Sequence, residues 1–404
     1  MRRVAVGGLV LALFLGGAAA TVGALRTPPR SAAGTPSSSL PRVDSSLPDW
    51  AAPGALVRVE GFAPASRHVT LRTTAGRTLA ATLSGPRGRF RLRFRASDPG
   101  RYRLRVAAAG TTVPAGSLLV RPLVLAAVGD VTLGEQVGPA VEAHGGAYPW
   151  TGVARTLRDA DVTVGNLETS VSTRGVAASK QYAFRGPPQA LPAMGRLAGF
   201  DVLTLANNHA VDYGPEALLD TIRYVRAAGI QPIGAGANAD LERRPAIVEA
   251  GGLRVALLGY SDVNPLGFPA TAWTPGTARA DPAAIAADVR AARHRADVVV
   301  CFFHWGVELQ PQPDARQRSL ASACLAAGAQ VVLGAHPHVF GRIERPGRRA
   351  LVAWTLGNFV FPSSGAPAQT GILEVRLGAD GVRGYRVLPV RIDGFRPRLV
   401  RRSG

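Results

Sequence analysis

The most constraining feature of this 404-residue sequence is a set of five short, mainly apolar runs, each followed within three residues by polar side chains. The runs are residues 124–128, 162–164, 202–205, 298–303 and 331–333. Their length and mainly apolar character are typical of strands buried on both faces. In an α/β sheet the carboxyl ends of such strands form the edge where sites assemble. The sequence therefore predicts an α/β region whose polar side chains converge on one site.

The polar residues after these runs include four of the seven histidines of the chain. The candidates are Asp130, Asn166, Glu168, Asn208, His209, His304, His336 and His338. Imidazole nitrogens suit Zn, Fe or Mn, and carboxylate and amide oxygens complete harder sites. Imidazoles and carboxylates also transfer protons. Together these residues predict one metal or acid/base centre.

Two of the motifs carry a more specific expectation. His336 and His338 flank a proline, which favours an extended backbone before it, and residues i and i+2 of an extended segment point the same way. We therefore expect both imidazoles to converge. Asn208 and His209 are adjacent, so one can bind metal while the other protonates a leaving group. Asp212 could orient that imidazole, although capping the helix that begins at Gly214 is the simpler explanation.

The chain starts like an exported protein. Two arginines precede an uncharged apolar stretch, and residues 1–25 thus have the charged and apolar regions of an export signal. This segment could be cleaved, or it could remain as a membrane anchor. Residues 26–53 have the Pro-, Ser- and Ala-rich composition of a disordered linker. We expect an extracytoplasmic protein, either membrane-anchored or secreted.

Residues 54–121 read as a small all-β domain, an Ig-like sandwich, because short alternating segments are separated by turn signals. Its last two strands, near residues 89–95 and 101–105, are expected to pair as a hairpin. One face of this hairpin would be almost wholly cationic. The arginines proposed to bind a polyanion are Arg89, Arg91, Arg93, Arg101 and Arg103.

The excess of arginines in the first part of the chain is consistent with binding of a polyanion and also with a solvated cationic face. Residues 1–121 contain 18 arginines and four acidic residues. Like charges that face each other across a hairpin are destabilising. A bound polyanion, such as an acidic polymer or anionic lipid headgroups, would explain why such a face is tolerated. A solvated cationic face is the alternative.

Strand-like and helical segments alternate from residue 122 to 394, which predicts an α/β domain followed by a basic tail at 395–404. Amphipathic helices are expected at 215–228, 283–292 and 317–327. Cys301 and Cys324 fall on a buried strand and on a helix. We interpret them as two buried thiols, with a single disulfide as the alternative.

Residues 124–375 resemble the CapA-type capsule and poly-γ-glutamate biosynthesis proteins, whose domain is related to the calcineurin-like metallophosphoesterases. The resemblance rests on six motifs in family order. They are GDVTLG at 129–134, GNLET at 165–169, LANNHAVDYG at 205–214, HWGVEL at 304–309, GAHPHVFG at 334–341 and LGNFVF at 356–361. The family implies a four-layer αββα sandwich with the site in the loops after the strands.

The resemblance also implies roles for individual residues. Asp130, Asn208, His304, His336 and His338 match positions that hold a two-metal centre in the phosphoesterases, and His209 matches the histidine near the leaving group. Trp305, Glu308 and Asn358 look like family-specific pocket residues, which we expect to bind substrate.

The motifs also depart from the phosphoesterase pattern. That pattern has a histidine two residues after its first aspartate, whereas this chain has Thr132. Where the pattern has a bridging aspartate, this chain offers Asn166 and Glu168. One or two divalent ions are therefore expected, with Mn, Fe and Zn not distinguished.

The sequence thus predicts an exported metal-dependent hydrolase that acts in synthesis, release or attachment of an anionic capsule or poly-γ-glutamate-like polymer. Asp130 would contribute to catalysis as well as to metal binding, and the bond cleaved would be a phosphoester or an amide. The alternative is a non-catalytic subunit that holds the polymer beside a membrane synthetase complex. No nucleic-acid partner is expected.

Overall fold

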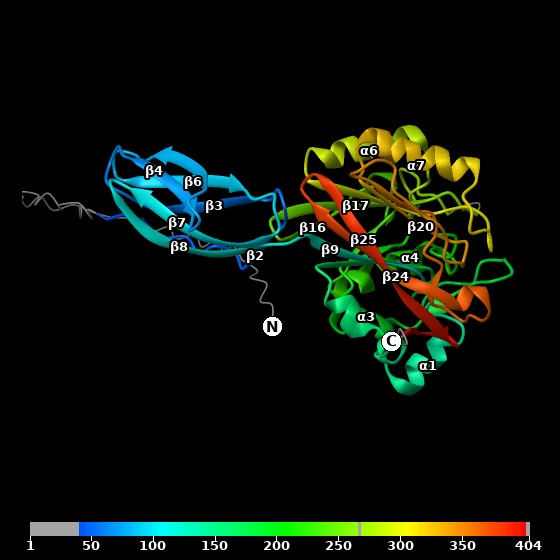
Figure 1. Cartoon of the computed structure of the whole chain (residues 1–404). Helices are drawn as coiled ribbons and strands as arrows, with labels where there is room; N and C mark the ends of the chain where they lie inside the picture. Colours follow the sequence, from blue (N-terminus) through cyan, green and yellow to red (C-terminus); the bar gives the residue numbers. More distant parts are fainter. Residues whose placement is uncertain (1–39, 266–267, 401–404) are drawn as a thin grey trace, which may run out of the picture. The chain divides into compact units, whose positions relative to one another are not determined.

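The structure of the chain is a computed structural model that describes residues 40–265 and 268–400 (Figure 1). The predicted export segment at 1–25 and the first half of the predicted linker, residues 26–39, lie outside the described residues, so both stay predictions. Among the residues described, no helix is long and apolar enough to cross a membrane.

Residues 42–120, all of which are described, contain eight strands in two sheets. The three-stranded sheet has the order β1 (Arg42–Val43), β3 (Leu56–Phe62) and β6 (Arg89–Arg95). The five-stranded sheet has the order β2 (Trp50–Ala51), β8 (Thr111–Val120), β7 (Gly100–Ala108), β4 (His68–Thr73) and β5 (Thr78–Leu83). Inward residues of both sheets belong to one buried cluster. The Ig-like classification and a domain boundary at residue 121 stay predictions.

Two predicted boundaries are wrong because short strands occupy the ends of the expected linker and tail. β1 pairs with β3 and β2 pairs with β8, so the linker cannot extend to residue 53. At the other end, β26 (Arg396–Leu399) pairs with β25 (Gly381–Asp393). The predicted basic tail at 395–404 therefore begins inside a sheet.

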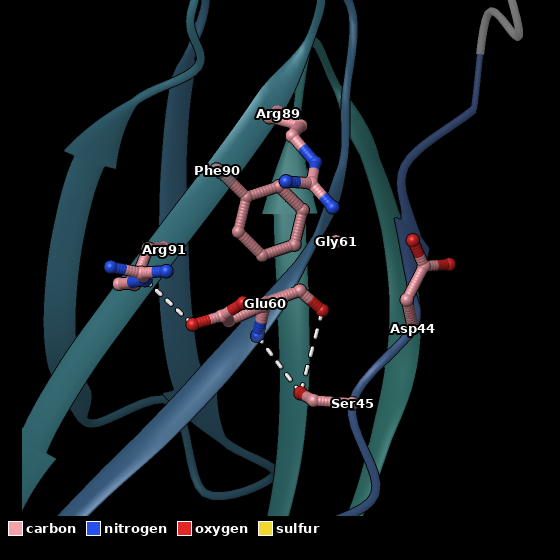
Figure 2. Close-up of a pocket in the computed structure, with 7 residues that line it drawn as sticks. All are labelled: Asp44, Ser45, Glu60, Gly61, Arg89, Phe90 and Arg91. Atoms are coloured by element: carbon pink, nitrogen blue, oxygen red, sulfur yellow. Dashed lines mark hydrogen bonds and ion pairs between the residues drawn. The ribbon is translucent and has the colours of Figure 1, made fainter. Parts of the chain in front are cut away.

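The predicted hairpin between the two arginine-rich strands is also wrong. β6 pairs with β3, whereas β7 pairs with β4 and β8 in the other sheet. The alternation of apolar and charged residues was correct, since the arginines of both strands are exposed and the residues between them are buried. Alternation specifies which face is buried but not which strand is the neighbour. Figure 2 shows Arg91 of β6 joined to Glu60 of β3.

The larger sheet of the α/β region has eight strands among the described residues. Its order is β14 (Gln231–Ile233), β13 (Val202–Thr204), β10 (Val162–Leu167), β9 (Leu123–Val131), β24 (Gln369–Gly378), β25 and β26, and β23 (Asn358–Val360) also pairs with β9. β14, β13, β10, β9 and β23 run parallel. Their carboxyl ends therefore lie at one edge.

The second sheet has the order β16 (Ala246–Ala250), β17 (Leu253–Ser261), β19 (Val298–His304), β20 (Val331–Ala335), β22 (Leu351–Ala353) and β21 (Ile343–Glu344). Two short pairs complete the strands described: β11 (Ser170–Val171) with β12 (Arg185–Gly186), and β15 (Ala235–Gly236) with β18 (Gly276–Thr277). β17, β19, β20 and β22 are parallel. They bring His304 and the segment after Ala335 to one end of this sheet.

Helices cover the outer faces of both sheets. The α-helices described are α1 (Val137–His144), α2 (Ala154–Arg158), α3 (Leu191–Arg196), α4 (Gly214–Ala227), α5 (Ala239–Glu242), α6 (Pro282–Arg293) and α7 (Ala315–Ala327). Single 3₁₀ turns are η1 (Tyr148–Trp150), η2 (Pro188–Ala190) and η3 (Ala366–Ala368). The predicted helices at 215–228, 283–292 and 317–327 correspond to α4, α6 and α7. Asp314 caps α7 in a capping box with Gln317.

Three buried clusters define four layers. Leu125 and Val164 of the larger sheet share a cluster with Leu257, Val300 and Leu333 of the second, so the two sheets pack face to face. A second cluster joins the outer face of the larger sheet to α1, α3 and α4, and a third joins the other outer face to α6 and α7. The order is helix, sheet, sheet, helix, as expected.

The two cysteines lie in the third cluster. Cys301 on β19 and Cys324 on α7 are buried, and their sulfur atoms lie 2.7 Å apart. They pack between a helix and a sheet, and both interpretations, two thiols or a single disulfide, stay predictions.

Candidate metal centre

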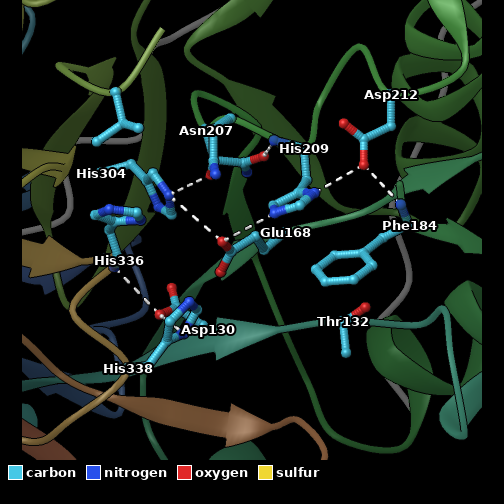
Figure 3. Close-up of polar contacts among 12 residues, drawn as sticks. Asp130, Thr132, Glu168, Phe184, Asn207, His209, Asp212, His304, His336 and His338 are labelled. Atoms are coloured by element: carbon cyan, nitrogen blue, oxygen red, sulfur yellow. Dashed lines mark hydrogen bonds and ion pairs between the residues drawn. The ribbon is translucent and has the colours of Figure 1, made fainter. Parts of the chain in front are cut away.

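Strand ends from both sheets bring the predicted polar residues together (Figure 3). Asp130 lies near the end of β9, Glu168 follows β10 directly, and His304 is the last residue of β19. His336 and His338 follow β20. The imidazole of His304 places Nε2 3.5 Å from Glu168 Oε1, and His338 Nδ1 lies 3.4 Å from Asp130 Oδ2.

Two overlapping groups of side chains have metal-ligand geometry. Glu168, His336 and His338 form one group, and Asp130, Glu168 and His304 form the other; within each, the potential ligand atoms all lie within 4.8 Å of one another. Glu168 belongs to both groups. It therefore occupies the shared position for which the sequence offered Asn166 or Glu168.

The buried polar atoms of this cluster indicate that a cation fits. Glu168 is fully buried, and neither of its carboxylate oxygens has a hydrogen-bond partner among the described residues. The same holds for Nδ1 of His336. Burying a carboxylate without a partner is costly, and a bound metal ion is a usual compensation. Carboxylate oxygens and imidazole nitrogens are suitable ligands for Mn, Fe or Zn.

Burial and mutual charge shift the titration of this cluster. Burial raises the pKa of Glu168 well above its ordinary value, and the nearby Asp130 carboxylate raises it further. Burial lowers the pKa of His304 strongly and that of His336 to about 4, so both rings are neutral at neutral pH and offer lone pairs. Burial also opposes the charge of His338, but the carboxylates of Glu168 and Asp130 prevail and raise its pKa to about 10.

The backbone of the His336-Pro337-His338 segment differs from the extended form we expected. His336 has φ 96° and His338 has φ 58°, both in the region that favours glycine. The two rings still converge, with centroids 5.9 Å apart. The backbone N–H of His336 donates to Asp130 Oδ2 at 3.2 Å, which helps to hold this conformation. Left-handed backbone at non-glycine residues costs about 1–3 kcal/mol each and clusters at functional sites.

Both side-chain atoms of Asn166 contact other residues of the cluster. Its Nδ2 donates to Asp130 Oδ1 at 2.8 Å and lies 3.1 Å from His304 Nδ1. Its Oδ1 accepts from Asn207 Nδ2 at 3.0 Å. Both amide atoms are thus engaged with protein groups. A direct metal bond from Asn166 stays a prediction, whereas a role in orienting Asp130 and His304 follows from the contacts.

Asn208 and His209 both face the centre, through different neighbours. The side-chain oxygen of Asn208 is 2.8 Å from His304 Nε2, which places it beside the predicted ligands. His209 Nε2 is 4.0 Å from Glu168 Oε1, and its ring stacks on Phe184 with centroids 4.0 Å apart. The imidazole therefore faces the centre with one nitrogen and is fixed by an aromatic ring.

Asp212 orients His209 and does not cap the next helix. Its Oδ2 lies 2.7 Å from His209 Nδ1 and accepts from the Phe184 backbone N–H. α4 has Tyr213 as its N-cap without a side-chain cap. Of the two roles that the sequence left open, the first is the one the structure supports.

Sequence reasoning missed two residues of this site. The ammonium of Lys180 contacts Asp212 Oδ1 at 2.5 Å, His209 Nδ1 at 3.2 Å and the carbonyl oxygen of Asn208 at 2.7 Å. Asn207 Oδ1 accepts from the His209 backbone N–H at 3.0 Å, so it positions the loop as well as Asn166. The signals were present, because Lys180 is the lone lysine of the chain and Asn207 begins the motif.

The expected substrate-binding residues occupy three different environments. Trp305 is fully buried, stacks on Phe303 and donates from its indole N–H to the Trp354 carbonyl, which is a packing role. Asn358 is buried and lies 2.8 Å from His338 Nδ1. Glu308 is exposed, and its charge helps raise the pKa of Glu168. Substrate contacts for all three stay predictions, with Glu308 the one that is accessible.

Thr132 occupies the position at which the phosphoesterase pattern has a histidine. Its side chain is buried, and its hydroxyl accepts from the Gly134 backbone N–H at 3.1 Å. It thus holds the loop after β9 and supplies no imidazole. The other candidate ligands gather without it.

The chain matches known capsule proteins over the region that holds this centre. The model of the family described as "Bacterial capsule synthesis protein PGA_cap" matches residues 124–363. The chain is 31% identical over 280 residues to the PGA biosynthesis protein CapA of Bacillus subtilis (strain 168), covering 68% of this chain and 73% of that one. It is also 31% identical over 287 residues to the capsule biosynthesis protein CapA of Bacillus anthracis, covering 69% of each.

Among solved structures, a 5'-nucleotidase precursor from Thermus thermophilus is 16% identical and covers 69% of this chain and 54% of that one, with a TM-score of 0.42. A similarity at this level carries no argument about function.

Proposed function

Because this chain belongs to the family of bacterial capsule synthesis proteins, we propose that it is a metal-dependent hydrolase acting on an anionic cell-surface polymer during its synthesis, release or attachment. The observation that carries the proposal is Glu168, a fully buried carboxylate whose oxygens have no hydrogen-bond partner in the described residues and face three histidines. A purely structural carboxylate would be expected to have donors around it.

The residues that would hold the ion or ions are Asp130, Glu168, Asn208, His304, His336 and His338. The two ligand groups that share Glu168 fit either one ion or two. When bound, a divalent ion supplies Lewis-acid polarisation of a substrate oxygen and lowers the pKa of water. Asn166, Asn207 and Asn358 keep the ligand side chains in place through their hydrogen bonds.

His209 would move the proton. Asp212 fixes Nδ1, so Nε2 is the atom that faces the centre. Burial lowers the pKa of His209, and this effect prevails although the Asp212 carboxylate raises it, so the ring is neutral at neutral pH. His209 would accept at Nε2 the proton that the attacking water loses, and would then give it to the leaving-group oxygen or nitrogen. The substrate bond is a phosphoester or an amide.

The polymer would be met outside the cytoplasm, since residues 1–25 have the pattern of an export signal. In this proposal the chain is anchored or secreted, and it works beside a membrane synthetase complex. Fractionation of cells that express the full chain tests this part independently of activity.

The alternative function is a non-catalytic subunit that holds the polymer. Two observations favour it: Thr132 supplies no imidazole ligand, and the strands of residues 42–120 carry many exposed arginines. A relative that is 31% identical over 206 residues is named "Probable polyglutamine synthesis accessory protein" in Mycobacterium tuberculosis. In this alternative, the chain would bind the polymer without cleaving it.

The test uses the full chain reconstituted with Mn, Fe or Zn and assayed on bis-p-nitrophenyl phosphate and on γ-glutamyl-p-nitroanilide. We expect turnover on one of the two, and loss by roughly 10²–10⁴-fold in His209→Ala with metal content unchanged. His294→Ala, at the exposed C-cap of α6, is the matched control and should remain active. Bound metal with no turnover on either substrate in any metal form would contradict hydrolysis and favour the polymer-holding subunit.

A further inference from the structure

The outward face of the five-stranded sheet carries a row of arginines with no acidic neighbour in its strands. Arg101, Arg103 and Arg105 alternate along β7 and are exposed. Arg72 of β4 is exposed as well and stands directly opposite Arg105 in the strand register. The side chains on one face of a strand repeat about every 6–7 Å, so the row is regularly spaced.

These four charges are not neutralised within the described part of the chain. β2, β4, β5, β7 and β8 contain no Asp or Glu. Arg72 donates to the hydroxyl of Thr78, and none of the four forms an ion pair with a described residue. Like charges opposite each other across strands destabilise the fold. The repulsion between these arginines is therefore not compensated within the described strands, and a bound anion would reduce it.

The arginines of the three-stranded sheet differ because most of them are already engaged. Arg91 Nε lies 2.6 Å from Glu60 Oε1, Arg42 Nε lies 2.7 Å from Asp44 Oδ1, and Arg95 donates to the Gly54 carbonyl. Arg89 lies over the Phe62 ring.

The hollow of about 340 Å³ on that sheet is lined by both Asp44 and Glu60 (Figure 2). Arg58 of β3 and Arg93 of β6 lie opposite each other and form no ion pair with a described residue. Glu60 lies two residues after Arg58 on β3, so a carboxylate is next to this pair as well. A polyanion would meet carboxylates on this face.

We propose that Arg72, Arg101, Arg103 and Arg105 form a docking surface for a linear polymer that bears carboxylates. Guanidinium groups bind carboxylates through two parallel hydrogen bonds, and a regular row suits a repeating chain. A bilayer is the poorer partner, because Leu83 is the one large hydrophobic side chain that the five strands expose in the described structure, and none exposes an aromatic ring. The surface needs no hydrolysis, so it goes beyond the proposed function.

The proposal also revises the set of arginines expected from the sequence. Arg101 and Arg103 stay in the docking surface and are joined by Arg72 and Arg105. Arg89, Arg91 and Arg93 lie on the other sheet and become the matched control.

The experiment compares two triple variants of the full chain that each remove three positive charges: R101S/R103S/R105S and R89S/R91S/R93S. Retention on immobilised polyglutamate is measured at about 20 mM and about 300 mM salt, since screening should weaken a charged surface contact. We expect about a tenfold or larger loss of affinity at low salt for the β7 variant and less than about threefold for the β6 variant. Circular dichroism and thermal unfolding show that both variants fold.

Three outcomes would overturn the proposal: equal losses in both variants, which indicate net charge alone; no loss in either; or a loss confined to phosphatidylserine vesicles. The chain with its native arginines and the β7 variant are also both measured with His336→Ala and His338→Ala in place. Polymer binding by the arginine row should not change when the metal ligands are removed, so a failed hydrolysis assay leaves this result interpretable.

Discussion

Glu168 and Asp220 are both buried carboxylates of the α/β region, and their surroundings are opposite. Asp220 accepts hydrogen bonds from Ser172 Oγ at 2.7 Å, Arg174 Nε at 2.8 Å and Arg223 Nη2 at 3.0 Å. These donors, Arg174 first, lower its pKa well below the ordinary value. Glu168 has no arginine, hydroxyl or backbone donor among the described residues, only the imidazoles of His304 at 3.5 Å and His209 at 4.0 Å, and burial raises its pKa. A satisfied carboxylate stabilises the fold, whereas an unsatisfied one beside histidines is suited to bind a cation.

The largest expected effect comes from Glu168→Gln, which removes the carboxylate that both ligand groups share. We expect metal affinity to fall by roughly 100-fold or more, since losing only outer partners of ligands already costs about 10–100-fold. The metal-free variant should unfold near the native temperature, because a neutral amide resembles the protonated acid. Metal titration followed by calorimetry measures the first quantity and thermal unfolding the second. Unchanged metal affinity would remove Glu168 from the centre.

Asp220→Asn should show the reverse pattern. We expect a loss of about 1–3 kcal/mol in the free energy of unfolding at pH 7, because Arg174 and Arg223 lose their charged acceptor. Since the pKa of Asp220 is lower in the folded state, its contribution should be full above about pH 4 and disappear as the pH falls. Denaturant unfolding at pH 7 and pH 3 measures this. Metal content should stay native; a large metal loss would contradict the division of roles.

Asn207→Ala tests whether the residues that hydrogen-bond to the ligands affect metal binding, and we expect an effect smaller than that of Glu168→Gln. The side chain donates to Asn166 Oδ1 and to the Leu167 carbonyl at 2.8 Å and accepts from the His209 backbone N–H. We expect metal affinity to fall about tenfold, as for other outer partners of ligands. Asn238→Ala, which removes the cap of α5 far along the chain, is the matched control and should leave metal affinity unchanged.

The smallest expected change in stability comes from Glu242, which is buried and has no hydrogen-bond partner at Oε2 among the described residues. Unlike Glu168, it belongs to neither of the two groups of described residues that could hold a metal ion. Burial raises its pKa from 4.5 to about 7. The folded protein therefore binds more protons than the unfolded chain between these values, and the free energy of unfolding from Glu242 falls as the pH rises through this window.

Glu242→Gln should remove that slope. The variant is expected to be more stable than the native protein at pH 8 and similar to it near pH 4.5, with metal content unchanged. Thermal unfolding at the two pH values measures the effect. A native-like pH slope in the variant would show that Glu242 is not its source.

The sequence predicted that these candidate ligands would lie close together because each lies at or just after the carboxyl end of its strand. Asp130, Glu168 and His304 are found where continuous apolar runs end, and parallel pairing brings those ends together. The helices were predicted equally well from their periodicity. Local patterns of this kind identify both the type of element and the residue at which it ends.

Other features depended on partners far away in the sequence. The alternation in β6 and β7 fits any antiparallel neighbour, so it could not identify β3 and β4. Lys180 reaches the centre from the loop after β11, and no pattern near residue 180 indicates its contact with Asp212. The left-handed backbone of His336 is stabilised by tertiary contacts, which override the local preference before a proline.

The most direct test of a metal centre at Glu168 is elemental analysis of the purified full chain beside the His336→Ala, His338→Ala double variant. We expect one or two equivalents of Mn, Fe or Zn in the native protein and a loss of most of that metal in the double variant, with Asp220→Asn retaining the native content. No metal in the native protein after reconstitution, or equal metal in the double variant, would contradict a metal centre at Glu168.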